Sequence, residues 1–390
     1  MPGAAMRPAG AAAPPPAPTV GLLAAEQGSR LERLGAAGVA LLLGAAYIAV
    51  SSALIAYNKY LIDHERFPFA VPLVLMHTAF CSAASAALYV LRPSLFPSLT
   101  DPDRRVVVDR SLMCKGAIPI GFFFAGQLVL SNTAYLHSSV SFLQMLKEAN
   151  LAIVYLLSLA FALEKFNWWS ARMLLLVAVF TGMTIHGELN FSITGFAIQG
   201  LSQCFECLKI VLQAMLLSSA GRKLDALTYV MLVMPICFMV LLALLGALHL
   251  IGPGQDILRT PHREDLAAWW PHLAANTLLA FTLNVVIALF VKQSSAIAFL
   301  LAGIVKDAMI VISAAVFLRE TITPLQAVGF ALQLGTITVY SLVKTFPDHF
   351  EQGVLLGLGA MLCGRGPQAA KKAAQEAREY GSVEGGERAS

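Results

Sequence analysis

Three lysines lie in the middle of long apolar stretches of this 390-residue sequence: Lys147, Lys209 and Lys306. A lysine at mid-membrane costs about 2.5–3.5 kcal/mol on insertion scales, so such residues usually face a bundle interior or a wet cavity. The ammonium group is a compact, strongly hydrated point charge that suits phosphate. Two or three converging lysines therefore indicate a site for a phosphorylated anion.

The composition indicates that these stretches lie in a membrane. The chain is 57% hydrophobic and only 13% charged, with a mean hydropathy of +0.71, whereas an average soluble domain is about a quarter charged. A window of about 19 residues marks ten segments long enough to span a bilayer as helices. They cover residues 35–57, 69–91, 112–134, 138–163, 170–187, 194–219, 226–250, 270–291, 294–318 and 322–344. The sequence predicts an all-α polytopic membrane protein with ten transmembrane helices.

The distribution of lysine and arginine predicts the orientation. With ten spans both tails lie on one side of the membrane. That side collects 19 of the 27 basic residues, against five on the opposite side and the three in mid-span. The positive-inside rule therefore puts both tails in the cytosol. We expect a disordered N-terminal tail at 1–34, rich in proline and alanine, and a polar C-terminal tail at 346–390.

Residues 35–190 and 191–345 each hold five predicted spans and share a motif. The fourth span contains "SSVSFLQMLKEANLAIVYLLSLAFALEKF" and the ninth "SSAIAFLLAGIVKDAMIVISAAVFLRET". Both open on paired serines, carry lysine followed by an acid and alanine, and close at an acid. Because five is odd, the second repeat must be inverted relative to the first, as in many secondary transporters with a site near the midplane. The lysines of the two motifs then face one cavity.

Internal ion pairs are the alternative explanation for these charges. Glu206 and Lys209 are three residues apart and can bridge each other on one helix turn, which favours a structural role for Lys209. Glu148 and Asp307 each follow a lysine directly, about 100° round the helix. We therefore expect the lysines that precede them to remain free for a ligand.

Several stretches occur together in a specific order within residues 40–345. They are "YNKYLI" with "FPFAVPLVLMH", "SNTAYLHSSVSFLQMLK", "HGELNFSITGF", "FTLN" and "AGIVKD". In this order they resemble the nucleotide-sugar transporter and triose-phosphate translocator family of the drug/metabolite transporter superfamily, and "KD" resembles its Lys-Asp subgroup. The resemblance implies that Lys147 and Lys306 contact the substrate phosphate. It also implies that Gly303, in a motif that binds the nucleotide portion, permits close approach of substrate to the backbone.

Other polar residues on the predicted spans fit the same cavity. Lys209 stands where members of that family often carry arginine. The remaining candidates for substrate binding are His77, Asn132, Tyr135, Gln144 and Asn284. A hydrogen bond between helices explains these five as well as ligand contact does. Tyr135 offers a ring face and a hydroxyl for a sugar or base.

These features predict a secondary-active antiporter that exchanges a nucleotide sugar or sugar phosphate for a nucleotide monophosphate or inorganic phosphate. The sequence predicts no cofactor, metal or nucleic acid. The stretch "CFEC" at 204–207 is a lone C-x-x-C pair, which is a weak signal for a metal site. The alternatives are an intramembrane transferase, for which no acid–base set recurs at a suitable spacing, and an exporter of another substrate class. Cytosolic tails favour the Golgi or endoplasmic reticulum over the plastid envelope, and small-residue helix faces allow a homodimer in membrane lipid.

Overall fold

The computed structural model describes residues 20–103, 105–218, 224–251, 261–293, 296–351 and 353–362. All regular elements in these residues are helices, and eight helical segments are long and apolar enough to cross a membrane. These segments are Gly38–Leu61, Ala70–Leu91, Arg110–Ala134, Val140–Ala160, Trp168–His186, Ala226–Leu248, Arg263–Phe290 and Pro324–Thr345. The described chain is therefore an all-helical polytopic membrane protein, as predicted.

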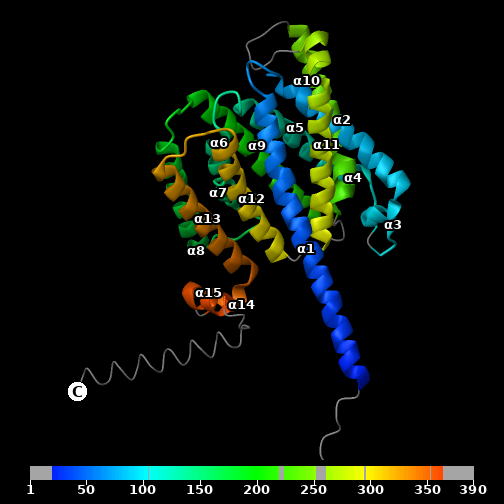
Figure 1. The fold of residues 1–390 in the computed structure, drawn as a ribbon, viewed down its shortest axis with the longest axis vertical. Coiled ribbons are helices and arrows are strands. Elements are labelled where there is room, and N and C mark those ends of the chain that lie inside the picture. Colours follow the sequence, from blue (N-terminus) through cyan, green and yellow to red (C-terminus); the bar gives the residue numbers. More distant parts are fainter. Residues whose placement is uncertain are drawn as a thin grey trace, which may run out of the picture.

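The longest helix, α1 (Val20–Leu61), reaches beyond the helix bundle at one end (Figure 1). It begins inside the range 1–34 that the composition predicts as a disordered tail, and residues 1–19 lie outside the described residues. The other long helices are α2 (Ala70–Leu91), α5 (Ile118–Ala134), α8 (Trp168–His186), α9 (Ile193–Ser218), α10 (Ala226–Ile251), α11 (Arg263–Gln293), α12 (Ala296–Phe317) and α13 (Pro324–Thr345). Helices α9 and α12 occupy the places of the sixth and ninth predicted spans but are not among the eight apolar segments.

Shorter helices complete the described chain. They are the 3-10 turn η1 (Pro93–Leu95), α3 (Pro97–Thr100), α4 (Arg110–Leu112), the π turn η2 (Met113–Ala117), α6 (Val140–Lys147), α7 (Asn150–Ala160), α14 (Pro347–Phe350) and α15 (Val354–Leu362). Helices α14 and α15 lie in the range predicted as a C-terminal tail, and residues 363–390 lie outside the described residues.

The fourth predicted span carries a local 3-10 interruption. Helix α6 ends at Lys147, a turn covers Glu148 and Ala149, and α7 begins at Asn150. Both turn residues keep right-handed helical dihedrals, and the backbone N–H of Ala149 bonds to the carbonyl of Leu146 at 3.2 Å. Val140–Ala160 therefore remains one span. A stretch of 3-10 geometry inside a helix often marks a functional hinge.

Most of the helix packing joins the first half of the chain to the second. Six of these contacts form three equivalent pairs. The contact of α5 with α9 corresponds to that of α1 with α11, and the contact of α7 with α9 corresponds to that of α1 with α12. The contact of α5 with α10 corresponds to that of α2 with α11. Three further contacts pair α2 with α10, α6 with α12 and α8 with α13. Figure 1 shows the two halves interleaved in this way. When the helices are counted as ten spans, each of these contacts has a counterpart five spans along the chain.

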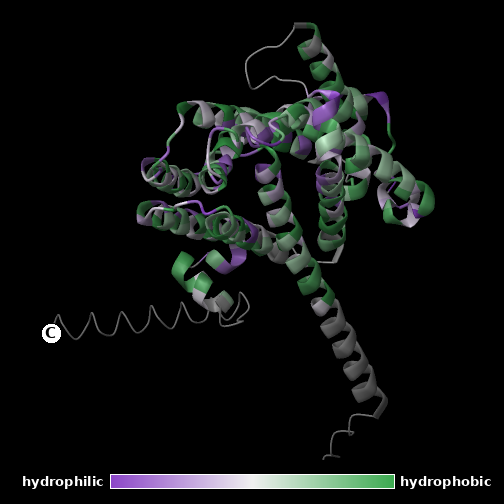
Figure 2. Cartoon of the chain, turned by 45° about the horizontal axis from the view of Figure 1, so that its top comes forward, coloured by the Kyte–Doolittle hydropathy of each residue, from purple (hydrophilic) through white to green (hydrophobic). Residues whose placement is uncertain are grey.

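The outer surface of the bundle is apolar. Leu41, Leu42, Leu175 and Phe317 are large hydrophobic residues that the fold leaves mostly exposed. Figure 2 shows hydrophobic residues along the helices and hydrophilic ones mainly at helix ends and connections. An exposed apolar surface of this extent is typical of contact with a lipid bilayer.

Two charged residues from distant helices hold the turn between α5 and α6. Lys59, near the end of α1, donates to the carbonyl of Ser138 at 3.2 Å. Glu320, just after α12, accepts from the backbone N–H groups of Val140 at 2.7 Å and Ser141 at 2.8 Å, and from the Ser141 hydroxyl at 2.6 Å. A carboxylate at the start of α6 satisfies N–H groups that have no partner within the helix and complements the helix dipole.

Removing the Glu320 carboxylate should destabilise the fold. Glu320→Ala leaves the start of α6 without its charged acceptor, and we expect a loss of about 2 kcal/mol. The measurement is the midpoint of thermal unfolding in detergent. Glu264→Ala, at an exposed position in the first turn of α11, is the control and should change the midpoint far less. Equal midpoints for the wild type and Glu320→Ala would contradict the role assigned to this carboxylate.

Candidate functional site

Six ionisable side chains from α6, α9, α12 and the α6–α7 turn gather inside the bundle. Electrostatic interactions link Glu206 to all three mid-span lysines, and link Glu148 to Lys147 and Lys306. All six residues are partly buried. This charge cluster consists of Lys147, Glu148, Glu206, Lys209, Lys306 and Asp307. The structure therefore brings together the lysines that the sequence singles out.

Lys306 is paired with its neighbour in sequence. Its Nζ lies 2.8 Å from Oδ1 of Asp307, and its ammonium group also hydrogen-bonds to the Tyr47 side chain on α1. The expectation that Lys306 stays free because Asp307 points elsewhere is wrong. The four-carbon lysine side chain is flexible enough to bring its ammonium back to an adjacent residue.

Glu148 and Asp307 lie next to each other, across the contact between the α6–α7 turn and α12. Glu148 is also within electrostatic reach of Lys147 and Lys306. The three lysines and three acids of the charge cluster balance in formal charge. The acids therefore compete with an incoming anion for the lysines.

Lys209 and Glu206 are held by different partners. The ammonium of Lys209 lies 4.3 Å from the centre of the Phe124 ring on α5, a cation–π contact. Glu206 Oε2 accepts from Nδ2 of Asn150, the first residue of α7, at 3.0 Å. Among the described residues no direct ion pair of the kind that their spacing allows joins Glu206 to Lys209, although the two attract each other electrostatically. The contacts with Phe124 and Asn150 attach α9 to α5 and to α7.

Lys147 differs from the other two lysines. It is the last residue of α6, directly before the turn inside the fourth span. Within the described part of the chain its ammonium makes no hydrogen bond and no direct ion pair, although Glu206 and Glu148 are within electrostatic reach. Donor groups without partners inside a membrane are costly. Lys147 is therefore the lysine best placed to take a ligand.

A buried hydrogen-bonded network joins α1, α2, α5 and α11. Asn58 Nδ2 on α1 donates to Asn132 Oδ1 on α5 at 3.1 Å, and Asn276 Nδ2 on α11 donates to Asn58 Oδ1 at 2.9 Å. His77 on α2 bonds through Nε2 to Asn276 Oδ1. For Asn132 and His77 the structure thus favours the hydrogen bond between helices over ligand contact. Asn58 and Asn276 were not among the candidates, and their only signal is an amide inside an apolar span.

Tyr135 and Gln144 lie next to each other at the start of the fourth span. The Tyr135 hydroxyl lies close to the Gln144 side chain, and Lys59 donates to the Tyr135 carbonyl. Gln144 is one turn before Lys147, so both point to the same face of α6. The amide nitrogen of Gln144 has no hydrogen-bond partner in the part of the chain that is described.

Gly303 and Asn284 are the remaining candidate residues for substrate binding. A methyl group added at Gly303 would meet no atom within 4 Å, so there is open space beside this turn of α12. Asn284 donates to the Ala280 carbonyl of its own helix at 3.0 Å and to Cys81 Sγ on α2 at 3.7 Å. The structure therefore leaves room for a ligand at Gly303, whereas Asn284 helps to pack α11 on α2.

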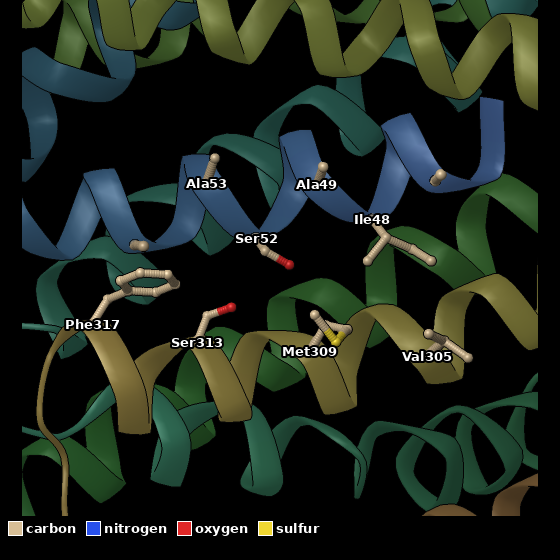
Figure 3. A pocket seen from close by; sticks show the side chains of 10 residues that line it. Ile48, Ala49, Ser52, Ala53, Val305, Met309, Ser313 and Phe317 are labelled. Atoms are coloured by element: carbon tan, nitrogen blue, oxygen red, sulfur yellow. The ribbon is translucent and has the colours of Figure 1, made fainter. Parts of the chain in front are cut away.

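A pocket of about 510 Å³ lies between α1 and α12 but is separate from the charge cluster. Ser52 and Ser313 point toward each other across it, and Val305 and Met309 line the α12 side (Figure 3). Its lining is almost entirely apolar and carries no charged residue. A phosphate therefore has no counter-charge in this pocket.

The fold and the charge cluster define a class: a helical membrane transporter with an ionic site in its interior. Residues 37–341 match the model of the Triose-phosphate Transporter family, and the chain belongs to this family. Two probable sugar phosphate/phosphate translocators of Arabidopsis thaliana are each 30% identical to it, over 77% and 78% of this chain and 82% and 84% of their own length. UDP-galactose transporter 1 of Arabidopsis thaliana is 27% identical, over 74% of this chain and 82% of its own. The resemblance drawn from the sequence is confirmed at the level of the family.

Removing the charge of Asp307 should strengthen phosphate binding. Asp307→Asn keeps the size of the side chain and removes the carboxylate that lies 2.8 Å from Lys306 Nζ. We expect the variant to bind phosphate up to about tenfold more tightly than the wild type, since a unit charge 10 Å away is worth about 1.7 kcal/mol at an effective dielectric constant of 20.

Calorimetric titration of both proteins with inorganic phosphate measures this difference. Glu164→Gln is the control, because Glu164 pairs with Lys344 on α13, outside the cluster. Equal affinity in Asp307→Asn and the wild type would show that this carboxylate does not compete with the anion for Lys306.

Proposed function

We propose that this protein is a secondary-active antiporter that exchanges a phosphorylated sugar compound for inorganic phosphate or a nucleotide monophosphate across an organelle membrane. The observation that carries the proposal is the meeting of Lys147 and Lys306, from α6 and α12, in one interior cluster. Relatives named as sugar phosphate/phosphate translocators support the exchange of a sugar phosphate for phosphate. The relative named as a UDP-galactose transporter keeps a nucleotide sugar as a second substrate class.

The two lysines take different roles at the substrate phosphate. Lys147, without a direct partner among the described residues, binds the phosphate first. Lys306 then turns from Asp307 toward the phosphate, and Asp307 stays beside Glu148. Gly303 lies one turn before Lys306 and leaves space for the rest of the substrate. Lys209 contributes its positive charge from its position over Phe124.

The same charges explain why such a carrier exchanges rather than leaks. Without a ligand, the charge on Lys147 is not directly compensated by any described residue inside the membrane, and this opposes movement of the helices past one another. A bound phosphate supplies the missing negative charge. The loaded protein therefore crosses between its two states more easily than the empty one, which couples movement in one direction to movement in the other.

Ten spans arranged as inverted repeats at 35–190 and 191–345 provide the moving parts. The matched packing of α5 on α9 and α1 on α11 supports this arrangement, with α9 and α12 as the sixth and ninth spans. The acids that close the two repeat motifs have different partners: Glu320 holds the start of α6, and Glu164 pairs with Lys344. A transporter with inverted repeats alternates between an inward-facing and an outward-facing state. In either state, equivalent residues of the two repeats are expected to have different partners.

The cellular setting follows from charge. Both tails are proposed to lie in the cytosol, and the protein is proposed to lie in a Golgi or endoplasmic reticulum membrane rather than in the plastid envelope.

The apolar α15, with "GLGAML" at 357–362, supports a homodimer in which small residues let helices approach closely. An intramembrane transferase is disfavoured because the relatives are named as transporters. Exporters of cationic compounds are disfavoured by the lysines.

Truncating either lysine of the proposed phosphate site should stop exchange. In proteoliposomes loaded with inorganic phosphate, we expect Lys147→Ala and Lys306→Ala to lower uptake of labelled sugar phosphate at least about 100-fold, since charge-assisted contacts to phosphate are among the strong ones. Thermal stability without ligand should stay near that of the wild type for Lys147→Ala, because no direct partner of Lys147 is lost among the described residues. Lys165→Ala, at an exposed position after α7, is the matched control and should exchange normally. Wild-type exchange in Lys147→Ala would refute the proposed site.

A further inference from the structure

Buried amide side chains with unpartnered atoms gather beside Lys147. In the part of the chain that the structure describes, five amides on α5, α6, α7 and α9 carry such atoms. Gln199 is 0% exposed and has neither amide atom bonded; Gln203 is 4% exposed and Gln144 3%, each with a free Nε2. Gln127 Oε1 and Asn150 Oδ1 also lack a partner. We call these five residues the amide set.

Two contacts fix the register of α9 against α6. At the start of α9, a Cβ on Gly195 would lie 2.1 Å from Ser138 Oγ, so α9 begins next to the residues that precede α6. Further along, Glu206 Oε2 accepts from Asn150 Nδ2 at 3.0 Å, just after α6 ends. The two helices therefore run in the same direction at the same level, with equal rise per residue.

This register places the amide set alongside Lys147. Gln199 and Gln203 are one turn apart on α9, between its two contacts, and they are level with Gln144 and Lys147 on α6. On α5 the carbonyl of Gln127 accepts from Ser202 Oγ at 3.1 Å, so Gln127 lies at the same level. The amides thus extend away from the proposed phosphate position along the α5–α9 contact.

The unpartnered atoms specify what kind of group can satisfy them. Buried polar groups without partners cost free energy, and no lipid can supply a bond. The set includes acceptor oxygens on Gln127, Gln199 and Asn150 and donor nitrogens on Gln144, Gln199 and Gln203. A doubly ionised phosphate only accepts, so it cannot satisfy the three oxygens. A hydroxyl both donates and accepts, and so matches both kinds of atom.

We propose that the amide set binds the hydroxyl groups of a sugar while Lys147 holds the phosphate of the same molecule. The inference rests on the proposed function and names its substrate class more closely: a phosphate attached to a polyol. The hydroxyls can belong to the hexose of a sugar phosphate or to the ribose of a nucleotide, since both present the same chemistry.

The test compares the exchange of substrates with and without hydroxyl groups. Proteoliposomes are assayed with glucose 6-phosphate, uridine monophosphate, UDP-galactose and inorganic phosphate. The variants are Gln199→Met and Gln203→Met, which replace the amide by an apolar group of similar length. Gln333→Met is the matched control, because Gln333 is also 0% exposed and also has an unpartnered Oε1 among the described residues, but it lies on α13, where its Nε2 donates to Thr181 Oγ1 at 2.7 Å.

We expect both variants at the amide set to lower the preference for glucose 6-phosphate over inorganic phosphate by about tenfold. Their unfolding midpoints without ligand should not fall, because the substitutions remove atoms that have no partner. Gln333→Met should lower the midpoint and leave the preference unchanged. A loss confined to the uridine compounds would assign the amides to the ribose.

Two outcomes would overturn the inference. One is an unchanged preference in both variants, which would mean that the amides hold only water. The other is equal affinity of the wild type for glucose 6-phosphate and its deoxy analogues, a comparison that needs no variant and so does not depend on folding. Absence of any phosphate exchange by the wild type is a separate result, and it would refute the proposed function instead.

Discussion

A positive charge inside a membrane must be compensated close by, and this constraint organises the centre of the protein. Lys306 is compensated by Asp307 and Lys209 by the ring of Phe124, whereas Lys147 has, among the described residues, only the more distant attraction of acids such as Glu206. The contact of Lys209 with Phe124 attaches α9 to α5, and the neighbours Tyr47 and Glu148 connect the Lys306–Asp307 pair of α12 to α1 and to the α6–α7 turn. In the described part of the chain, the mid-span lysine without a direct partner is the one at this turn, where a substrate can complete the balance.

The membrane class and most helices could be predicted from the sequence because transfer of apolar side chains into lipid is a local property. The predicted spans at 69–91 and 322–344 correspond to Ala70–Leu91 and Pro324–Thr345. The mid-span lysines were found for the same reason, since a charge is conspicuous in an apolar segment. The family follows from the order of several short motifs, and the family match over 37–341 confirms it.

Other features depend on tertiary contacts and could not be predicted in this way. The stretch "LKEAN" contains neither glycine nor proline, yet the regular α-helical pattern is interrupted after Lys147, where α12 packs on α6 and α9 packs on α7. Asp307 was expected to point away from Lys306, and the rotamer that joins them depends on Tyr47 and Glu148 from other elements. The hydrogen-bonded network of Asn58 and its partners likewise forms only when four helices pack together. No single amide in the sequence therefore predicts it.

The measurement that tests the central claim most directly is calorimetric titration of detergent-purified protein with inorganic phosphate, for wild type and Lys147→Met. Methionine keeps the length and apolar stem of the side chain and removes only the charge. If Lys147 holds the substrate phosphate, wild type binds and the variant loses affinity at least about 100-fold. Equal affinity in the two proteins would contradict a phosphate site at the charge cluster and leave its lysines with a structural role alone.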